Sequence, residues 1–427
     1  MNTFLIVLTD KYPYGNGETF IENERCYWNF FTHVFIVPVL VRKEDVTRKN
    51  FLLSANETLI TSYDEKPNLI TAIKNIFGTF SIYSYCQEIN EIRKKKKISV
   101  DNLRCLLLIG ILTNLRINRI EQKIKELLTE SKNNSNSVKV LLYSYWMYEP
   151  ALVAAGIKKN YINSRFITRA HGYDLYEERH KNNYIPYREL ILDQADAIYP
   201  ISENGRRYLS ERYKGVYDQK ISVERLGTIK LFDEKKNKRN SKMLVMASCS
   251  NMVRLKRIDR IINTLRLFDQ EVKWYHFGDG ELMETLKAQS LSLPNNIQVH
   301  FMGRVPNQEV QKFYSVHHID VFLNVSETEG IPVSIMEVQS YGIPVVATDV
   351  GGTSELINDG VNGVLIKKDF TNEELVSAIN RVVANGEAYR DGARKKWITM
   401  SNAKSVYNSL FQKEYDTIVH EADISKE

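Results

Sequence analysis

Short apolar runs alternate with longer amphipathic stretches along most of this chain. The alternation predicts parallel strands joined by crossover helices, because a strand covered on both faces is apolar throughout whereas its helices are apolar on one side only. The runs form two series. The predicted strands span residues 4–9, 34–40, 138–146, 166–170, 197–201 and 221–226, then 243–248, 272–277, 297–302, 321–325, 344–347 and 363–366.

A stretch at residues 232–241 separates the two series. Its core consists of polar and charged side chains, whose burial would be unfavourable. The chain has 427 residues, enough for two cores, because single cores stop growing at about 250–300 residues. We therefore expect an α/β protein with a Rossmann-like domain over residues 1–232 and another over 233–404, facing each other across a cleft. Residues 405–427 should form a helix that packs back toward the first domain.

The composition is that of a globular protein, with 43% hydrophobic and 26% charged residues. Met1 leads directly into an apolar strand without a basic leader or cleavage site, and no apolar run approaches the roughly 20 residues that span a bilayer. The four cysteines lie far apart, which argues against a zinc site or a disulfide framework. We expect a cytoplasmic protein.

The net charge of +6 is too small to imply a nucleic-acid partner. Its distribution is more informative, because residues 93–97 form an unbroken basic run that precedes an apolar stretch at 106–112. Further basic side chains follow at Arg116, Arg119, Lys123 and Lys125. Two interpretations stay open: a solvated helix face, or a surface that rests on anionic lipid at the inner membrane face.

The strongest motif surrounds a glycine loop between the strands predicted at 321–325 and 344–347. Pro332 suits the first turn of a helix, where its missing N–H would have no partner anyway. A glycine loop that leads from a parallel strand into a helix presents free N–H groups to a diphosphate or a sugar hydroxyl. Glu329 and Glu337 flank Pro332, and each carboxylate can accept two hydroxyl hydrogen bonds. Taken singly, either acid could equally be an exposed surface residue.

This segment resembles the retaining glycosyltransferases of the GT-B fold that are often called family 4. Their signature is a Glu, seven residues and a second Glu, with Gly-(Leu/Ile)-Pro between them and a Gly-x-Pro-Val segment after. The matching residues are Glu329, Gly330, Ile331, Pro332, Glu337, Gly342, Pro344 and Val345. The resemblance implies that Glu337 binds the nucleotide ribose, that Glu329 faces the donor sugar, and that the amides of Gly330, Ile331 and Pro332 approach the sugar and diphosphate.

A second match follows the first strand of the second series. The family has Gly-Arg, four residues and then Lys-Gly-x-Asp, whose Arg and Lys neutralise the donor diphosphate. Lys256 and Asp259 align with it, but Asn251 stands in the position of the Arg. Half of the cation pair is therefore missing or replaced, with Arg254 and Arg257 as the candidates. A lone lysine is ordinarily a surface residue. Here, however, a leaving diphosphate needs positive charge beside it, which favours a role for Lys256 in binding the diphosphate.

In the first domain, Gly15 and Gly17 follow the first strand and precede a predicted helix. A glycine turn at this place lets the backbone approach a ligand, although two glycines can also form an ordinary turn. In the family this loop approaches the diphosphate and the acceptor. The resemblance therefore assigns Gly17 and Asn16 to the donor site.

His171 lies at the end of the strand predicted at 166–170, in a segment similar to the family's His-Gly-x-Asp. The resemblance implies contact with the donor sugar, and the alternative is a packed structural histidine. Residues 202–203 and 278–281 also resemble family positions. Arg304, after Gly303, would lie close to the nucleotide base.

Together these matches imply a hexosyltransferase with retention of configuration, acting in surface polysaccharide synthesis. His171, Glu329 and Lys256 would be catalytic; Asn251 and Arg254 would bind the donor with the residues named above. No metal or cofactor is expected, since no Asp-x-Asp follows a strand, and preorganised charge would stabilise the leaving diphosphate. Attack would come from the front face. The partners would be a nucleotide-sugar donor, bound by the second domain, and a glycan or lipid-linked acceptor, bound by the first, with peripheral contact to anionic membrane.

Other functions on this fold stay open, namely a nucleotide-sugar 2-epimerase, a phosphorylase, and a non-catalytic nucleotide-sugar-binding module with a degraded site, which Asn251 in place of Arg makes conceivable. A nicotinamide dehydrogenase is disfavoured because no G-x-G-x-x-G follows a strand. The donor base and sugar, the acceptor, the linkage and the oligomeric state stay undetermined.

Overall fold

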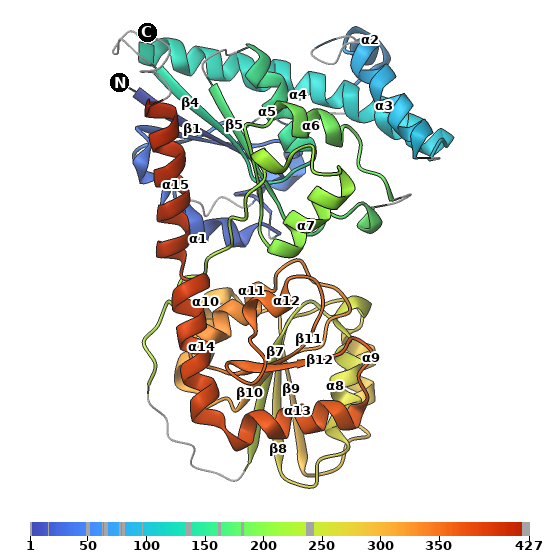
Figure 1. Ribbon diagram of the computed structural model, residues 1–427, viewed down its shortest axis with the longest axis vertical. Helices are drawn as coiled ribbons and strands as arrows, with labels where there is room; N and C mark the ends of the chain where they lie inside the picture. Colours follow the sequence, from blue (N-terminus) through green and yellow to red (C-terminus); the bar gives the residue numbers. More distant parts are fainter. Residues whose placement is uncertain are drawn as a thin grey trace. The chain divides into compact units, whose positions relative to one another are not determined.

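The structure is a computed structural model of the chain. It describes residues 2–15, 17–47, 52–61, 63, 67–76, 78, 82–95, 97–132, 138–160, 164–180, 183–235 and 243–420. The chain divides into two compact units, Met1–Glu224 with Tyr407–Glu427, and Arg225–Val406 (Figure 1). Each unit holds one six-stranded parallel sheet.

The sheet of the first unit has the strand order β3-β2-β1-β4-β5-β6. Its strands are β1 (Asn2–Thr9), β2 (His33–Pro38), β3 (Glu57–Leu59), β4 (Val138–Ser144), β5 (Ser164–Ala170) and β6 (Ala197–Pro200). Its helices are α1 (Glu22–Arg25), α2 (Leu69–Lys74), α3 (Ile82–Lys94), α4 (Val100–Lys132), α5 (Glu149–Asn160), α6 (Arg188–Gln194) and α7 (Glu203–Arg212).

The sheet of the second unit has the order β12-β11-β10-β7-β8-β9. Its strands are β7 (Leu244–Cys249), β8 (Val272–Phe277), β9 (Ile297–Gly303), β10 (Val321–Asn324), β11 (Val345–Thr348) and β12 (Gly363–Ile366). Its helices are α8 (Ile258–Leu265), α9 (Met283–Ser290), α10 (Asn307–Val316), α11 (Val333–Ser340), α12 (Thr353–Leu356), α13 (Asn372–Ala384) and α14 (Gly386–Met400), and α15 (Ala403–His420) follows.

Both strand orders reverse once, at β1/β4 in the first unit and at β7/β10 in the second. The loops that leave the two strands at such a switch point run in opposite directions and leave a crevice at their carboxyl ends. Ligands of open parallel sheets bind in this crevice. Each unit therefore has one place where a site is expected on topology alone.

The central strands are buried on both faces, which explains why their residues are mostly apolar. Residues Phe4 to Leu8 of β1 are fully buried, as are Leu244 and Met246 of β7 and Trp274 of β8. Such strands are apolar throughout, which is why their pattern is visible in the sequence. The α/β class with two doubly wound parallel sheets is confirmed.

The strand predicted at residues 221–226 is wrong. Only Ile221 pairs, as an isolated bridge to Ile198 of β6, although Ser222 and Glu224 donate backbone hydrogen bonds to that strand at 3.1 Å each. The apolar pattern there reflects burial of a connecting segment and not a strand. Conversely, the short β3 was missed, because three residues at a sheet edge carry too little pattern.

Residues 225–232 belong to the second unit, so the boundary predicted at 232 falls inside that unit. Thr228 donates its backbone N–H to the Ser401 carbonyl at 2.8 Å and accepts from the Trp397 indole at 2.9 Å. Arg225 pairs with Glu355 at 3.0 Å. These contacts hold the segment against α12 and α14. The predicted linker residues 236–241 lie outside the described residues.

Helix α15 carries most of its length in the first unit, from Tyr407 onward. The fully buried Glu414 of α15 accepts hydrogen bonds from the Arg165 Nε at 2.7 Å and from the Tyr199 hydroxyl. Leu410 and Phe411 are buried beside it. A buried ion pair thus ties the C-terminal helix to β5 and β6. Among the helices described in full or in part, none is long and apolar enough to span a bilayer.

Candidate functional site

The β7/β10 switch point of the second unit holds an ion pair. Lys256 ends a 3-10 turn after β7, Glu329 lies in the loop after β10, and the Lys256 Nζ lies 2.5 Å from the Glu329 Oε1. Asn324 donates to the same oxygen at 3.4 Å. Glu329 is 8% exposed, while the lysine side chain is 25% exposed. A cation and a carboxylate are therefore preorganised where topology predicts a ligand.

The glycine loop beside this pair leads into α11, as expected. Pro332 occupies the N-cap position and offers no side-chain hydrogen bond, so the first N–H groups of the helix have no capping partner. Ile331 and Pro332 are buried, and Gly330 is partly accessible. The amino end of α11 thus presents unpaired N–H groups and the positive end of the helix dipole.

The loop after β11 supports the loop that carries Glu329. A Cβ at Gly351, whose φ is +56°, would lie 2.0 Å from the Glu329 carbonyl oxygen. Gly352 donates its N–H to the Gly330 carbonyl at 2.8 Å. Backbone therefore packs directly on backbone at this point, and only glycine leaves room for it.

Glu337 lies inside α11 and is 9% exposed. The Asn307 amide donates to its Oε1 at 2.7 Å, and the described residues supply no other donor to this carboxylate. Burial raises the pKa of Glu337 to about 7, and the Asn307 hydrogen bond opposes that shift. Burial and the Glu337 charge also raise the pKa of the Cys249 thiol to about 12. The carboxylate has unused capacity to accept hydroxyl hydrogen bonds.

The two arginines considered as replacements at the Asn251 position differ in their surroundings. Arg257 donates to the carbonyls of Val325 and Lys368 at 2.8 Å each, so its guanidinium fixes the loops after β10 and β12. Arg254 and Asn251 are exposed, and their side chains make no hydrogen bond or ion pair with described residues. Arg254 is thus an exposed cation of this loop whose side chain has no partner among the described residues.

The turn at residues 278–281 supports the loop that carries Asn251. A Cβ at Gly278, whose φ is +136°, would lie 1.9 Å from the Ser250 carbonyl oxygen, and Gly278 also donates its N–H to Gly303 at 2.8 Å. These glycines serve close backbone packing. Arg304 follows β9 and is exposed without a side-chain partner among the described residues.

In the first unit, the loop after β1 is organised by Glu18, which the sequence prediction missed. Its carboxylate accepts from the backbone N–H groups of Asp10, Lys11 and Tyr12 at 3.0, 2.7 and 2.6 Å, and from the Trp146 indole at 2.6 Å. The available signal in the sequence was an acidic residue directly after the glycines at 15 and 17. Glu18 joins the carboxyl ends of β1 and β4.

Gly17 is exposed, and a Cβ there would meet no atom of the protein within 4 Å. The packing around this position therefore leaves room for a side chain and does not itself require glycine. Asn16 lies outside the described residues.

His171 directly follows β5 and is 6% exposed. Its ring packs against Tyr145 and Trp146, with centroids at 4.8 and 4.5 Å. Neither ring nitrogen makes a hydrogen bond to a described residue, and Nδ1 lies 3.7 Å from the Asp174 carboxylate. Asp174 instead accepts from the backbone of His171 at 2.7 Å and of Met147 at 2.8 Å, so it joins the ends of β4 and β5. Ser202, by contrast, caps α7.

Among the described residues of the basic run at 93–97, Lys94, Lys95 and Lys97 pair with carboxylates. Lys95 and Lys97 lie 3.5 and 3.2 Å from the Glu177 carboxylate, and Lys94 lies 2.6 Å from Glu91. The later basic residues are also engaged, with Arg119 and Lys123 donating to backbone carbonyls. The exposed feature of this region is apolar. Its large exposed side chains are Leu52, Leu53, Leu69, Ile70, Ile73, Ile89, Ile98, Val100, Leu107 and Leu108.

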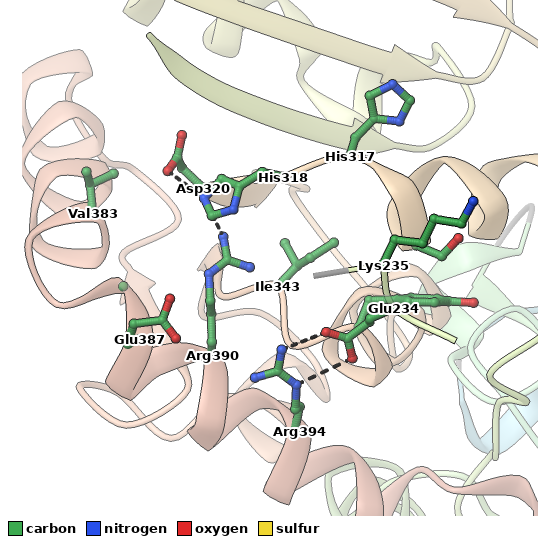
Figure 2. Close-up of a pocket in the computed structure, with 13 residues that line it drawn as sticks. Glu234, Lys235, His317, His318, Asp320, Ile343, Val383, Glu387, Arg390 and Arg394 are labelled. Atoms are coloured by element: carbon green, nitrogen blue, oxygen red, sulfur yellow. Dashed lines mark hydrogen bonds and ion pairs between the residues drawn. The ribbon is translucent and has the colours of Figure 1, made fainter. Parts of the chain in front are cut away.

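A separate cavity of about 720 Å³ in the second unit is shown in Figure 2. It lies at the amino ends of β10 and β11, away from the carboxyl ends that carry Lys256 and Glu329. Arg394 binds Glu234 at 2.7 Å, and Arg390 contacts His318, which lies 3.3 Å from Asp320. No group of three His, Cys, Asp or Glu side chains among the described residues is arranged to hold a metal ion.

The two parallel sheets and their switch-point loops define the fold of the GT-B glycosyltransferases. The chain is similar to the lipopolysaccharide outer core galactosyltransferase WaaB, with a TM-score of 0.61 over 96% of this chain and 99% of that one, at 18% identity. It is also similar to HepE of Anabaena in complex with UDP, with a TM-score of 0.65 over 98% and 100%, at 13% identity. These likenesses concern the fold.

Residues 230–398 match the family described as Glycosyl transferases group 1. The O-antigen biosynthesis glycosyltransferase WbnH of Escherichia coli is 34% identical over 136 residues, which cover 31% of this chain and 36% of that protein. The family match therefore falls on the unit that carries Lys256, Glu329 and Glu337.

Proposed function

We propose that the protein is a glycosyltransferase that moves a sugar from a nucleoside diphosphate sugar to a glycan or lipid-linked acceptor in surface polysaccharide synthesis. The observation that carries the proposal is the Lys256–Glu329 ion pair of 2.5 Å beside the uncapped amino end of α11. It combines a cation, a carboxylate and free N–H groups, which suit a diphosphate joined to a polyol. The family match over residues 230–398 supports the same activity.

The proposed donor roles follow the chemistry of each group. Lys256 and the N–H groups of α11 neutralise the diphosphate, and Glu329 accepts from hydroxyls of the transferred sugar. Glu337, buried with one donor, accepts from the ribose hydroxyls. The exposed Arg254 takes the place of the cation absent at Asn251. The complex of HepE with UDP supports a nucleotide ligand.

Three further roles rest on the resemblance of the motifs. Arg304 lies close to the base, Gly17 and Asn16 approach the diphosphate, and His171 contacts the donor sugar. The two unpartnered ring nitrogens of His171 support the last role, because a buried polar group without a partner costs about 1–3 kcal/mol unless a ligand satisfies it.

We further propose that transfer proceeds with retention of configuration and without a metal ion. Lys256 and the helix terminus supply the positive charge that a divalent ion supplies in other sugar transferases. Attack from the front face lets the leaving phosphate receive the proton of the acceptor hydroxyl. The anomeric configuration of the product, read by NMR, tests retention.

We infer that the protein works in the cytoplasm and rests on the membrane through α2, α3 and α4. The exposed apolar side chains of these helices support the contact, with Arg93 and Arg104 exposed among them. Apolar side chains bordered by cations bind anionic bilayers from the side. The basic run itself contributes less than its sequence indicates, because Lys95 and Lys97 hold Glu177.

The test is turnover of a panel of UDP-, GDP- and ADP-sugars in EDTA, with Lys256→Ala and Glu337→Ala beside the wild type. One donor should turn over, with kcat/KM lower by about 10²–10³ in Lys256→Ala. Lys287→Ala, which breaks an exposed 3.0 Å pair with Glu284 in the same unit, is the matched control and should leave turnover unchanged. Turnover of no donor would contradict the proposal, and an epimerised nucleotide sugar as product would favour the epimerase.

A further inference from the structure

The switch point of the first unit brings Asp10, at the end of β1, against Tyr148, which follows β4. The Tyr148 hydroxyl donates to the Asp10 Oδ2. The second carboxyl oxygen, Oδ1, is buried and has no hydrogen-bond partner among the described residues. A buried oxygen without a donor is costly, so its place in a crevice is consistent with a ligand that supplies the donor.

Two neighbouring carboxylates are engaged through both of their oxygens. Glu18 accepts from three backbone N–H groups and an indole, and Asp174 accepts from two backbone N–H groups. A third, Glu149, lies 3.4 Å from the Arg116 guanidinium through one oxygen. Asp10 differs from Glu18 and Asp174 because one of its carboxyl oxygens accepts no hydrogen bond from a described residue.

A series of aromatic rings extends from this carboxyl, beginning with Tyr148. Trp146 and Tyr148 lie edge to face with centroids 6.2 Å apart, and Tyr173 meets Tyr148 edge to face at the same distance. Tyr173 is 53% exposed, so its ring is accessible from solvent. On the other side of Trp146 lies His171, whose side chain is 7% exposed and whose ring nitrogens lack a hydrogen-bond partner among the described residues. Flat apolar faces beside hydroxyl acceptors suit a sugar ring, which is apolar on its C–H faces and polar at its rim.

The charges around Asp10 select against an anion. Burial raises the pKa of Asp10 to about 8, and the nearby Glu18, Glu149 and Asp174 add to the rise, while the Tyr148 hydrogen bond lowers it. The nearest basic side chain along the chain, Lys11, is directed to Asp45 at 3.0 Å. A phosphate or a uronate at this place would be repelled, whereas a neutral hydroxyl would not.

We propose that Asp10, Tyr148 and Tyr173 form the subsite for the acceptor, and that the acceptor presents a neutral sugar there, with a hydroxyl donating to the Asp10 Oδ1. This inference rests on the proposed glycosyltransferase function and names its acceptor class. If the acceptor is lipid-linked, its phosphate lies outside the subsite and the terminal sugar lies within it. Asp10 is a positioning residue for this hydroxyl.

The experiment uses the full chain with Asp10→Asn and Tyr148→Phe. The first readout is tryptophan fluorescence during titration with methyl glycosides of glucose, galactose and N-acetylglucosamine, with decyl phosphate as the anionic probe. The second is initial rate against glycoside concentration with the donor found above, compared with donor hydrolysis in the absence of acceptor. Asp193→Asn with Tyr217→Phe is the matched control, since it removes an equivalent 2.8 Å tyrosine–aspartate hydrogen bond elsewhere in the unit.

We expect at least one methyl glycoside to quench the fluorescence of the wild type and of the control variant. Asp10→Asn should weaken this binding and raise the acceptor KM by about 10-fold or more, while donor hydrolysis stays within about 2-fold, because the variant alters the carboxyl group that binds the sugar hydroxyl and leaves the donor site unchanged. Tyr148→Phe should raise the acceptor KM in the same direction.

Three results would overturn the inference: decyl phosphate bound in preference to every glycoside, no glycoside bound at all, or donor hydrolysis lost in parallel with transfer in Asp10→Asn. Failure of the proposed function is a separate outcome. A wild type that hydrolyses no donor but shows glycoside quenching that Asp10→Asn abolishes would retain the sugar subsite and reject the transferase.

Discussion

At the scale of single residues, the two acids of the glycine-loop motif have different environments. Glu329 is paired with Lys256 at 2.5 Å, whereas Glu337 is buried inside α11 with the Asn307 amide as its donor. Seven intervening residues carry the chain from a loop into a helix, so the two carboxylates belong to different elements. The different partners of Glu329 and Glu337 fit their proposed roles, in which Glu329 binds hydroxyls of the transferred sugar and Glu337 binds the ribose hydroxyls.

Glu337 gives a prediction about stability and pH. Its pKa is raised from 4.5 to about 7, so its ionisation is opposed in the folded state. The resulting destabilisation is absent below about pH 4.5, grows as the pH rises and is complete above about pH 7, at about 3 kcal/mol. Glu337→Gln removes the charge. We therefore expect the variant to have a higher Tm than the wild type at pH 8 and a similar Tm at pH 5, while nucleotide binding is lost.

The control for this prediction is Glu284→Gln, whose side chain is 86% exposed in the same unit. It should show no Tm difference that grows with pH. A Glu337→Gln variant that is less stable than the wild type at pH 8 would show that the ionised carboxylate is stabilised by its surroundings.

At the scale of elements, the helices α2, α3 and α4 differ from the rest of the first unit. Leu69 and Ile70 of α2 are 77% and 67% exposed, and Val100 of α4 is 81% exposed. Helices that pack only against a core turn such side chains inward. Outward apolar side chains on consecutive helices indicate a surface that meets something apolar.

This surface gives a prediction about membrane binding. Leu69→Ser with Ile70→Ser should lower the binding constant for vesicles of phosphatidylglycerol and phosphatidylethanolamine, measured by co-sedimentation, by about 30-fold or more, since each of the two apolar side chains contributes about 1 kcal/mol or more when it inserts. The Tm should stay unchanged because both side chains are exposed.

Val216→Ser, at a residue that is 73% exposed elsewhere in the same unit, is the control for vesicle binding. Two results would contradict a specific contact with anionic membrane through α2. One is equal vesicle binding by the α2 variant and by the Val216→Ser control. The other is wild-type binding to phosphatidylcholine vesicles that equals its binding to the anionic vesicles.

At the scale of the whole molecule, each unit has its own hydrophobic core. We therefore expect two unfolding transitions in calorimetry. The nucleotide ligand should raise the free energy of unfolding of Arg225–Val406, which carries Lys256 and Glu337, by about 2.7 kcal/mol at a concentration 100 times its Kd. Titration with UDP, GDP and ADP checks this. A single transition, or a transition of Arg225–Val406 that no nucleotide shifts, would contradict the prediction.

The sequence prediction of the second unit was nearly complete, and that of the first was not. In the second unit each predicted strand overlaps an observed one, from β7 to β12. In the first, no strand was predicted between residues 40 and 138, a stretch that contains β3 as well as α2, α3 and α4. Those helices keep apolar side chains exposed, so the contrast between buried and solvated faces, on which such a prediction depends, is weak there.

The sequence alone determined the two parallel sheets and the placement of Glu329, Pro332 and Glu337 around a helix start, because burial patterns and turn chemistry are local properties of the chain. Tertiary structure decided which of these residues meet. Strand order at the switch points joins Lys256 to Glu329 across 73 residues and Asp10 to Tyr148 across 138. A single sequence has no local signal for partners so far apart, since they are set by which strands lie side by side.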